Sequence, residues 1–373
     1  MRICIIGSGH IGTTLACYFK HYNSRAHVSL YTRHPERFTG TIKCNDIEKK
    51  ISYIEHIDCV SNDPYKVGKD ADIVFIALPH FAVEKAFQDI APYVSQKAFI
   101  GVLPGGGGCE FFFNKYFDRD KTLFGFQRVP FTAKLVDYGK ETNLKSWKPY
   151  SVVGTQRSDR IDTTCEIIEK CGLKTKPANN YLSIALTPTN PILHTSRTYD
   201  IFRNYDRDHV FDDRFKYYVG WTDHASETML TMDEELHTLL NNISEIDTSI
   251  ILPLTEHYEA PTIKAMTEKI NSIQTFQSVY APLVQVDNGN GFVADTTSRM
   301  FTEDFPWGLA IFRSYFEIIG IKAHMMDIVL SWYAKYMGYD WYIDGKFCGK
   351  DLKNTGILQN YGIETKKQLL MFY

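Results

Sequence analysis

The first residues of the chain that could do specific chemistry are glycines that can hold phosphate groups. The apolar run RICII is followed by a glycine-rich segment that leads directly into a helical run. This segment consists of Gly7, Ser8, Gly9, His10, Ile11 and Gly12. With this spacing the first glycine permits a tight turn, the second lets the backbone approach a pyrophosphate, and the third lets the helix pack on the strand. The helix N-terminus adds free N–H groups and a partial positive charge. We therefore predict a dinucleotide site, and the alternative is an incidental glycine-rich turn.

The end of the second predicted strand bears on the choice between NAD and NADP. Thr32 stands about 20 residues after the last of these glycines, where NAD-binding folds usually place an Asp or Glu for the ribose hydroxyls. A hydroxyl followed by Arg33, with Arg37 nearby, suits a 2′-phosphate better, because guanidinium binds phosphate through a bidentate fork. We therefore expect NADP(H) in preference to NAD(H). Alternatively, Arg33 is a solvated surface charge or stacks on adenine.

Two later loops also follow strand-like runs and could contact the cofactor. Leu78 and Pro79 end one such run, and Pro104 is followed by four glycines that begin at Gly105. Ligands bind at the carboxyl ends of strands in parallel sheets. Backbone without side chains can lie flat against a nicotinamide ring or a substrate. We expect Leu78, Pro79 and Gly105 to contribute to the cofactor site, and a mobile loop without a ligand is the alternative.

A hydride-transfer site also needs a proton donor or acceptor, and a cation for any substrate carboxylate. His194 is the best of the 12 histidines, because the segment NPILH opens the second predicted domain, which should face the cofactor. Asn190 could cap a helix and Pro191 could take its first position, which places His194 in the first turn or just past it. The alternative is a structural or solvated histidine.

A second segment of interest, TSRMFTED, contains Arg299 and Asp304. It precedes a strongly apolar helix with Pro306 near its start. An aspartate at a helix start is often only a cap or a partner of the helix dipole. Arg197, one turn after His194 on the same face, is a further candidate for substrate binding.

The elements that must position these residues fall into two domains, residues 1–182 and 183–373. In the first domain, short apolar runs at 2–6, 27–31, 72–78 and 98–103 alternate with helix-like segments such as 13–22 and 81–94. This pattern predicts a parallel sheet with helices on both faces, a Rossmann dinucleotide-binding domain. In the second domain, helical periodicity dominates at 226–243, 260–276, 307–321 and 324–338. The fold class is therefore α/β, with an N-terminal Rossmann domain followed by an all-helical substrate domain.

Composition excludes several other classes of protein. The net charge is −3, from 41 basic and 44 acidic residues, so we expect no nucleic-acid partner. No apolar stretch is long enough to span a membrane, and no signal peptide is evident. The eight cysteines form no CxxC pair, which favours reduced thiols and no metal site. We expect a cytoplasmic protein.

The motifs together resemble the opine dehydrogenases, the octopine and nopaline dehydrogenase group. The resemblance covers most of the chain and rests on GSGHIG, LPGGGGCEF, the NPxxH stretch that ends at His194, and TSRMFTEDFPWGL. It implies a Rossmann domain joined to a helical domain. It also implies that an imine formed from an amino acid and a 2-oxo acid is reduced by NADPH or NADH.

The resemblance also implies a role for each candidate residue. His194 matches the catalytic histidine of the family, Asp304 the carboxylate paired with it, and Arg299 an arginine that binds a substrate carboxylate. Around residues 127–134 the family often carries an arginine where this chain has Lys134. Arg128 and Lys134 could bind carboxylates there, although surface roles are an alternative.

Two other functions remain open from the sequence. One is a ketone or 2-oxo acid reductase, similar to the ketopantoate reductases or hydroxyacyl dehydrogenases, which share the two-domain plan. The other is a dinucleotide-binding sensor that catalyses nothing. The aromatic-rich helical domain could be core or could form a homodimer face.

Overall fold

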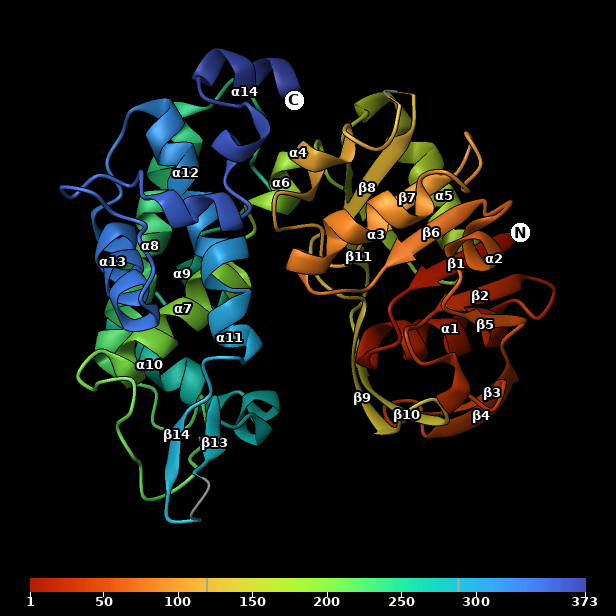
Figure 1. Cartoon of the computed structure of the whole chain (residues 1–373), viewed down its shortest axis with the longest axis horizontal. Coiled ribbons are helices and arrows are strands. Elements are labelled where there is room, and N and C mark those ends of the chain that lie inside the picture. The colour runs from red at the N-terminus through yellow and green to blue at the C-terminus, as the bar shows by residue number, and fades with distance from the viewer. Residues whose placement is uncertain (119, 287–288) are drawn as a thin grey trace. The chain divides into compact units, whose positions relative to one another are not determined.

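The computed structural model describes residues 1–118, 120–286 and 289–373, and Figure 1 shows its elements. Contacts divide the chain into two compact units, Met1–Thr187 with Tyr373, and Pro188–Phe372. The sequence predicted a boundary after residue 182, whereas the contacts place the short helix α6 (Leu182–Ala185) in the first unit.

A large, mostly parallel sheet forms the centre of the first unit. Among the described residues eight strands take part, in the order β12-β11-β8-β7-β6-β1-β2-β5. The strands are β1 (Arg2–Ile6), β2 (His27–Tyr31), β5 (Cys59–Ser61), β6 (Ile73–Ile76), β7 (Phe99–Val102), β8 (Thr122–Phe126), β11 (Ser151–Thr155) and β12 (Thr175–Pro177). β11 runs antiparallel to β8. The predicted parallel sheet is confirmed, and because β1 pairs with β2 on one side and β6 on the other, the strand order reverses at β1.

A second, smaller sheet was not predicted. Among the described residues it has four strands, in the order β4-β3-β10-β9. They are β3 (Thr41–Asp46), β4 (Ile51–His56), β9 (Phe131–Asp137) and β10 (Glu141–Trp147). Buried and exposed residues mostly alternate along β3 and β9, because one face is covered and the other is exposed. Their apolar content is therefore low, which hides them in a search for continuous apolar runs.

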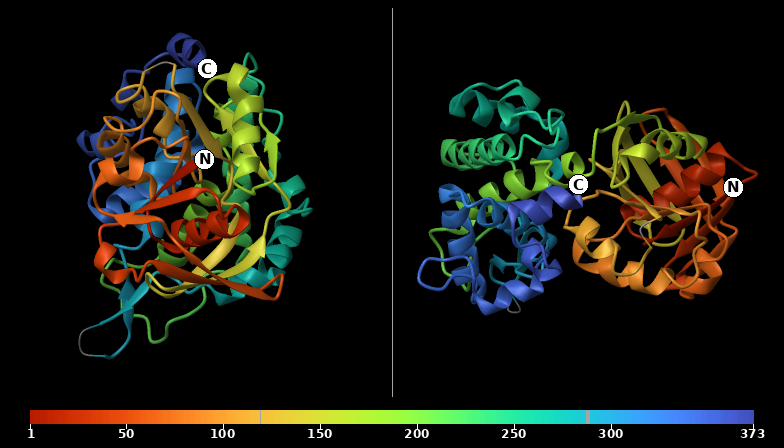
Figure 2. Two further views of the ribbon diagram at one scale, coloured as in Figure 1. Left: turned by 90° about the vertical axis from the view of Figure 1, so that its right-hand side faces the viewer. Right: turned by 90° about the horizontal axis from the view of Figure 1, so that it is seen from above.

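Helix α1 (His10–Tyr22) lies between the two sheets and contacts strands of both, as Figures 1 and 2 show. Phe19 is fully buried, which contributes roughly 1.5–3 kcal/mol. The Oγ1 atoms of Thr14 and Thr142, on β10, share a hydrogen bond of 2.6 Å. The remaining helices of this unit are α2 (Pro64–Gly68), α3 (Val83–Ile90), α4 (Cys109–Phe113) and α5 (Ile161–Lys170).

The second unit is built mainly of helices. They are α7 (Thr189–Phe202), α8 (Asp223–Asn242), α9 (Leu254–His257), α10 (Ile263–Ser272), α11 (Arg299–Thr302), α12 (Ala310–Ile319), α13 (His324–Met337) and α14 (Lys366–Phe372). The long helix α8 begins at the cap residue Thr222, whose Oγ1 accepts a hydrogen bond from Ala225 at 3.0 Å. It packs against α7, α10, α12 and α13. The prediction of a helical domain is confirmed, except that it is not all-helical, since β13 (Leu283–Gln285) and β14 (Phe292–Ala294) form a hairpin.

The middle of α8 carries a buried carboxyl beside a histidine. Oδ2 of Asp233 accepts a hydrogen bond from the backbone N–H of Leu254 at 2.7 Å. Its Oδ1 lies 4.0 Å from Nε2 of His237. Neither of these two atoms has a hydrogen-bond partner within the described part of the chain. Burial, with a smaller effect from the charge of Glu234, raises the pKa of Asp233 to about 7. Burial also lowers the pKa of His237.

We expect Asp233→Asn to remove a loss of stability that the wild-type protein shows between about pH 4 and pH 7. A carboxyl whose pKa rises on folding stabilises the fold fully below its unfolded pKa of 3.8, and this contribution is lost as the pH rises through about 7. Linkage limits the loss to about 4 kcal/mol. Asparagine keeps an acceptor for Leu254 and is neutral at every pH, so the free energy of unfolding in urea should depend less on pH.

Because His237 stays in place, the difference between the two profiles isolates the carboxyl. Glu227→Gln, at an exposed position of the same helix, is the matched control and should leave the wild-type slope unchanged. Equal slopes in the wild type and the Asp233 variant would contradict the prediction.

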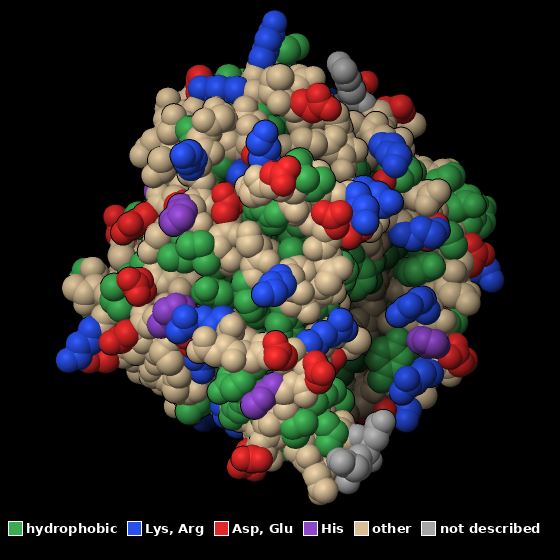
Figure 3. Space-filling view, turned by 60° about the vertical axis from the view of Figure 1, so that its left-hand side comes forward, with side chains coloured by type: hydrophobic (Ala, Val, Ile, Leu, Met, Phe, Trp, Pro, Cys, Tyr) green, Lys and Arg blue, Asp and Glu red, His purple; other side chains and the backbone are tan. Residues whose placement is uncertain are grey.

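No helix in the described ranges has both the length and the hydropathy that a membrane span requires. Figure 3 shows one face of the molecule, on which acidic and basic side chains are interspersed.

Candidate active site

His194 projects from the second turn of α7. This helix begins at Thr189, two residues earlier than the sequence suggested, so Asn190 is not its cap and Pro191 is its third residue. A proline is tolerated there because backbone N–H groups of the first turn have no partner within the helix. The carbonyl of His194 accepts a hydrogen bond of 2.6 Å from the hydroxyl of Tyr217.

Asp304 lies between α11 and a π-helical segment, Phe305–Leu309, that continues into α12. The segment packs closely on α7: a Cβ added at Gly308 would lie only 3.3 Å from the side chain of Pro191. Pro191 is one turn before His194, so this contact brings the aspartate to the histidine. π-helical turns are rare in proteins, and those that occur are often found at functional sites.

The imidazole of His194 and the carboxylate of Asp304 form a direct contact. Nδ1 lies 2.8 Å from Oδ2, and the two side chains are 18% and 12% exposed. Within the described residues the carboxylate of Asp304 makes no capping hydrogen bond to the helix that follows. Capping of that helix therefore does not explain the aspartate. A carboxylate at Nδ1 fixes the orientation of the ring. The other ring nitrogen, Nε2, then points away from the carboxylate and can exchange a proton with a ligand.

Arg299 begins α11, one turn before Asp304. Its Nε donates to Oε2 of Glu303, a buried carboxylate that orients the guanidinium, while the arginine side chain is 64% exposed. An arginine held through Nε can offer its terminal nitrogens to a carboxylate as a fork. The second unit therefore brings together a histidine–carboxylate pair, which has the groups needed for proton exchange, and, close to the carboxylate in sequence, an oriented cation.

The glycine loop of the first unit has the form that a dinucleotide requires. Gly7 has a φ of 107°, and a Cβ there would lie 2.6 Å from the carbonyl oxygen of Ala77. A Cβ at Gly12 would lie 1.8 Å from the carbonyl oxygen of Gly7, so only glycine lets α1 meet the loop. At Gly9, by contrast, no described atom lies within 4 Å of an added Cβ. The open space is therefore at the glycine that a pyrophosphate approaches, which fits the predicted cofactor.

Three hydroxyl groups from distant parts of the sequence meet beside this loop. Oγ of Ser8 lies 2.8 Å from Oγ1 of Thr32 and 2.6 Å from the hydroxyl of Tyr138. The hydroxyl of Tyr138 also lies 2.9 Å from Oγ1 of Thr32. The guanidinium of Arg37 lies 4.5 Å from the centroid of the Tyr138 ring, a cation–π contact. This hydroxyl cluster occupies the end of β2, where ribose hydroxyls bind in such folds.

Each unit of the chain matches a known protein family. Residues 177–337 match the NAD/NADP octopine/nopaline dehydrogenase alpha-helical domain, and residues 3–139 match the ketopantoate reductase family PanE/ApbA. An opine dehydrogenase from Haliotis discus hannai is 25% identical over 99% of this chain and 97% of its own length. A tauropine dehydrogenase from Arabella iricolor is 25% identical over 99% of each chain.

Over nearly its whole length the chain is similar to opine dehydrogenases.

Solved structures of two such enzymes agree with the fold of this chain. A structure of octopine dehydrogenase with NADH and L-arginine has a TM-score of 0.85 at 20% identity, covering 100% of this chain and 98% of that one. Yersinopine dehydrogenase with NADP⁺ bound has a TM-score of 0.68 at 14% identity, covering 97% of this chain and 98% of that one. The two-domain architecture predicted from the sequence is thus confirmed.

Arg197, which the sequence suggested as a substrate ligand, lies inside the helical unit. It is 4% exposed. Its Nε donates to the carbonyl of Tyr217 at 2.7 Å, and its terminal nitrogens bind Asp200 at 2.8 Å and the carbonyl of Val219 at 3.2 Å. Because Tyr217 in turn binds the backbone of His194, Arg197 supports the helix that carries the histidine. This position does not support the prediction that it contacts substrate.

The other predicted residues lie in the first unit. Arg128 is half-buried in the loop after β8, and Lys134 is exposed on β9 of the small sheet. Leu78 and Pro79 follow β6, and Cδ2 of Leu78 lies 2.8 Å from a Cβ added at Gly7, which places its side chain against the glycine loop.

Gly105 and His10, two of the predicted cofactor-binding residues, make contacts within the protein itself. Gly105 is buried, and an added Cβ would lie 2.6 Å from Cα of Gly125 and 3.0 Å from the hydroxyl of Tyr181. Close packing therefore accounts for a glycine at position 105. Nδ1 of His10 accepts a hydrogen bond from the backbone N–H of Leu135 at 3.1 Å, which ties α1 to β9.

Tyr138 and Glu303 were not predicted from the sequence. Tyr138 belongs to the turn between β9 and β10, and nothing in its local sequence points to a cofactor site. A Cβ at the next residue, Gly139, would lie 2.3 Å from the carbonyl oxygen of Arg37, so the turn fits against the segment after β2. Glu303 stands four residues after Arg299, the spacing of an ion pair within a helix, and that spacing could have identified it.

Proposed function

We propose that this chain is an NAD(P)H-dependent opine dehydrogenase, which condenses an amino acid with a 2-oxo acid and reduces the resulting imine. The observation that carries the proposal is the contact of 2.8 Å between His194 and Asp304, on a helical domain that follows a dinucleotide-binding unit. The amine and the ketone lose water to form a C=N bond, and a hydride with one proton converts this bond to a secondary amine. The cofactor, when bound, supplies the hydride.

The remaining steps are assigned to side chains of this protein. Arg299, oriented by Glu303, holds a substrate carboxylate, since both substrates carry one. His194 exchanges a proton at Nε2 with the oxygen or nitrogen of the substrate, and Asp304 stabilises the imidazolium that forms when Nε2 is protonated. The bond acted on is thus CH–NH, and the enzyme is an oxidoreductase in either direction.

The test is oxidation of NADPH and NADH by the purified chain with a grid of L-amino acids and 2-oxo acids, each also supplied alone. Turnover that needs both partners supports the proposal. Turnover with a 2-oxo acid alone would instead support a ketone reductase, which the match of residues 3–139 to the ketopantoate reductases favours as the second candidate. Absence of turnover in the whole grid would contradict both.

For the cofactor we propose a preference for NADPH, and predict that Arg33→Gln lowers kcat/KM for NADPH by about tenfold or more. The residue at the end of β2 is Thr32, whose hydroxyl binds Ser8 and Tyr138 and offers no carboxylate to repel a 2′-phosphate. Arg33 is exposed beside it. A hydrogen bond between charged groups contributes about 1.5–3 kcal/mol, which sets the expected size.

Steady-state kinetics with both cofactors will measure the effect, and kcat/KM for NADH should stay within about twofold. Arg25→Gln is the matched control, because Arg25 is also exposed but lies just before the start of β2, at the other end of the strand from Arg33. A wild-type enzyme that uses NADH and NADPH equally well would contradict the proposed preference.

A further inference from the structure

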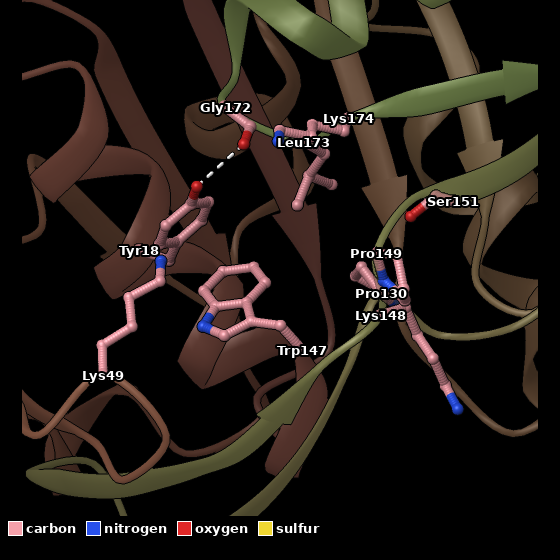
Figure 4. Close-up of a pocket in the computed structure, with 10 residues that line it drawn as sticks. All are labelled: Tyr18, Lys49, Pro130, Trp147, Lys148, Pro149, Ser151, Gly172, Leu173 and Lys174. Carbon is pink, nitrogen blue, oxygen red and sulfur yellow. Dashed lines mark hydrogen bonds between the residues drawn. The ribbon is translucent and has the colours of Figure 1, made fainter.

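A pocket of about 260 Å³ opens in the first unit, and no residue of the proposed active site lines it. As Figure 4 shows, its lining comes from five segments: α1, the β3–β4 turn, the β8–β9 loop, the stretch from β10 to β11, and the α5–β12 connection. Tyr18 lies eight residues after His10 on α1, which corresponds to about 12 Å along the helix. The pocket is therefore separate from the glycine loop at the helix N-terminus.

Two aromatic rings form one wall of the pocket, and both are fixed by hydrogen bonds. The hydroxyl of Tyr18 donates to the carbonyl of Gly172 at 2.8 Å. Nε1 of Trp147 donates to Asp46 at 2.8 Å, and its backbone N–H donates to Glu48 at 2.8 Å. The ring centroids of Tyr18 and Trp147 are 4.6 Å apart. The wall is therefore preformed and would not have to be ordered when a ligand binds.

The charged residues that line the pocket are all lysines. Among its described lining residues are Lys49, Lys148 and Lys174, and no carboxylate. The ammonium of Lys49 lies 4.3 Å from the centroid of the Trp147 ring, and 3.7 Å from Asp46. In Figure 4 the side chain of Lys148 extends away from the aromatic pair. Its flexible four-carbon stem allows it to turn toward an anion.

We propose that this pocket binds a small aromatic carboxylate, with its ring against Trp147 and Tyr18 and its carboxylate among the lysines. The volume lies just below the range of about 300–1,000 Å³ that is typical of drug-sized ligands, which favours a single ring over a nucleotide. Aromatic rings favour offset or tilted contacts with another ring, and an ammonium group favours an anion over a neutral group. This proposal does not depend on the reaction proposed above.

The test is saturation-transfer NMR on the whole protein with benzoate and with benzamide, and with inorganic phosphate added as a competitor of benzoate; benzamide lacks the negative charge and phosphate lacks the ring. We expect benzoate to bind, and both other probes to bind at least tenfold more weakly. In the Lys148→Glu/Lys174→Glu variant the Kd for benzoate should rise at least tenfold. Lys145→Glu, at an exposed position of β10 that does not line the pocket, is the matched control and should leave the Kd unchanged.

Arg299→Ala separates this pocket from the proposed active site, where a carboxylate could also bind. Retention of benzoate binding in that variant supports the proposal. Loss of binding in the Arg299 variant, with retention in the lysine variant, would overturn it. So would equal binding of benzoate and benzamide, or of benzoate and phosphate. So would the absence of benzoate binding at about 10 mM, a concentration that would occupy a site with a Kd of roughly 1 mM.

Discussion

A His194→Asn enzyme is expected to bind cofactor normally and to lose kcat by a factor of roughly 10²–10⁴, the usual contribution of a positioned general acid or base. Asparagine can still form a hydrogen bond near Asp304, but it cannot take up or release a proton at neutral pH. Asp304→Asn should also lower kcat, because an amide can neither balance an imidazolium nor fix the ring with the proton on Nδ1. The structure supports this pairing through the contact of 2.8 Å.

The same unit offers a matched control. Nδ1 of His224 lies 3.1 Å from an oxygen of Asp200, so it forms a second histidine–aspartate contact of the same kind. His224→Asn should leave kcat within about threefold, since that pair has no proposed part in the reaction. Steady-state kinetics, with cofactor binding followed by the fluorescence of NADPH, will separate kcat from binding. Equal losses in the His194 and His224 variants would indicate a structural effect and contradict the catalytic role.

The second large effect is expected in the glycine loop, where two substitutions of equal size should fail in different ways. A Cβ at Gly12 would lie 1.8 Å from a backbone oxygen of Gly7, so Gly12→Ala must displace α1 or the loop. Overpacking of this kind typically costs 1–3 kcal/mol and occasionally more. Gly9→Ala meets no described atom within 4 Å, so the fold should tolerate it. It places a methyl group where a pyrophosphate would approach.

Thermal unfolding and cofactor titration will distinguish the two variants. Gly12→Ala should lower Tm and weaken binding, whereas Gly9→Ala should keep the wild-type Tm and raise the Kd for the cofactor at least tenfold. A Gly9 variant that binds NADPH with wild-type affinity would contradict the position assigned to the pyrophosphate. A Gly12 variant with wild-type Tm would show that the loop can relax without cost.

The parts of the fold that could be predicted are those with a strong local pattern. The strand, glycine loop and helix at residues 2–22 combine a buried parallel strand with a spacing that has a mechanical reason at each glycine. The helices of the second unit have regular apolar periodicity, and those around residues 226–243 and 324–338 appear where expected. The pairing of His194 with Asp304 was reached through the family resemblance, because no local rule links positions so far apart in the sequence.

The remaining features depend on tertiary contacts. Tyr138 approaches Thr32 only because the small sheet packs against α1, and the low apolar content of that sheet hides it in the sequence. Arg197 shares a helix face with His194, as the spacing indicated, but its guanidinium turns inward to the carbonyls of residues 217 and 219. Sequence spacing gives the face of a helix, and it does not tell whether that face meets substrate or another segment of the chain.

The π-helical segment after Asp304 makes this part of the chain sensitive to its length. A π-helical turn holds one residue more than the α-helical turn that could replace it. Deleting one residue between Asp304 and α12 would favour continuous α-helix and rotate the aspartate by roughly 100° about the helix axis, away from α7. Substitutions in this stretch alter packing, but a change in the number of residues separates the carboxylate from the imidazole. Relatives that retain the histidine–aspartate contact should therefore vary here in residue type and keep the spacing constant.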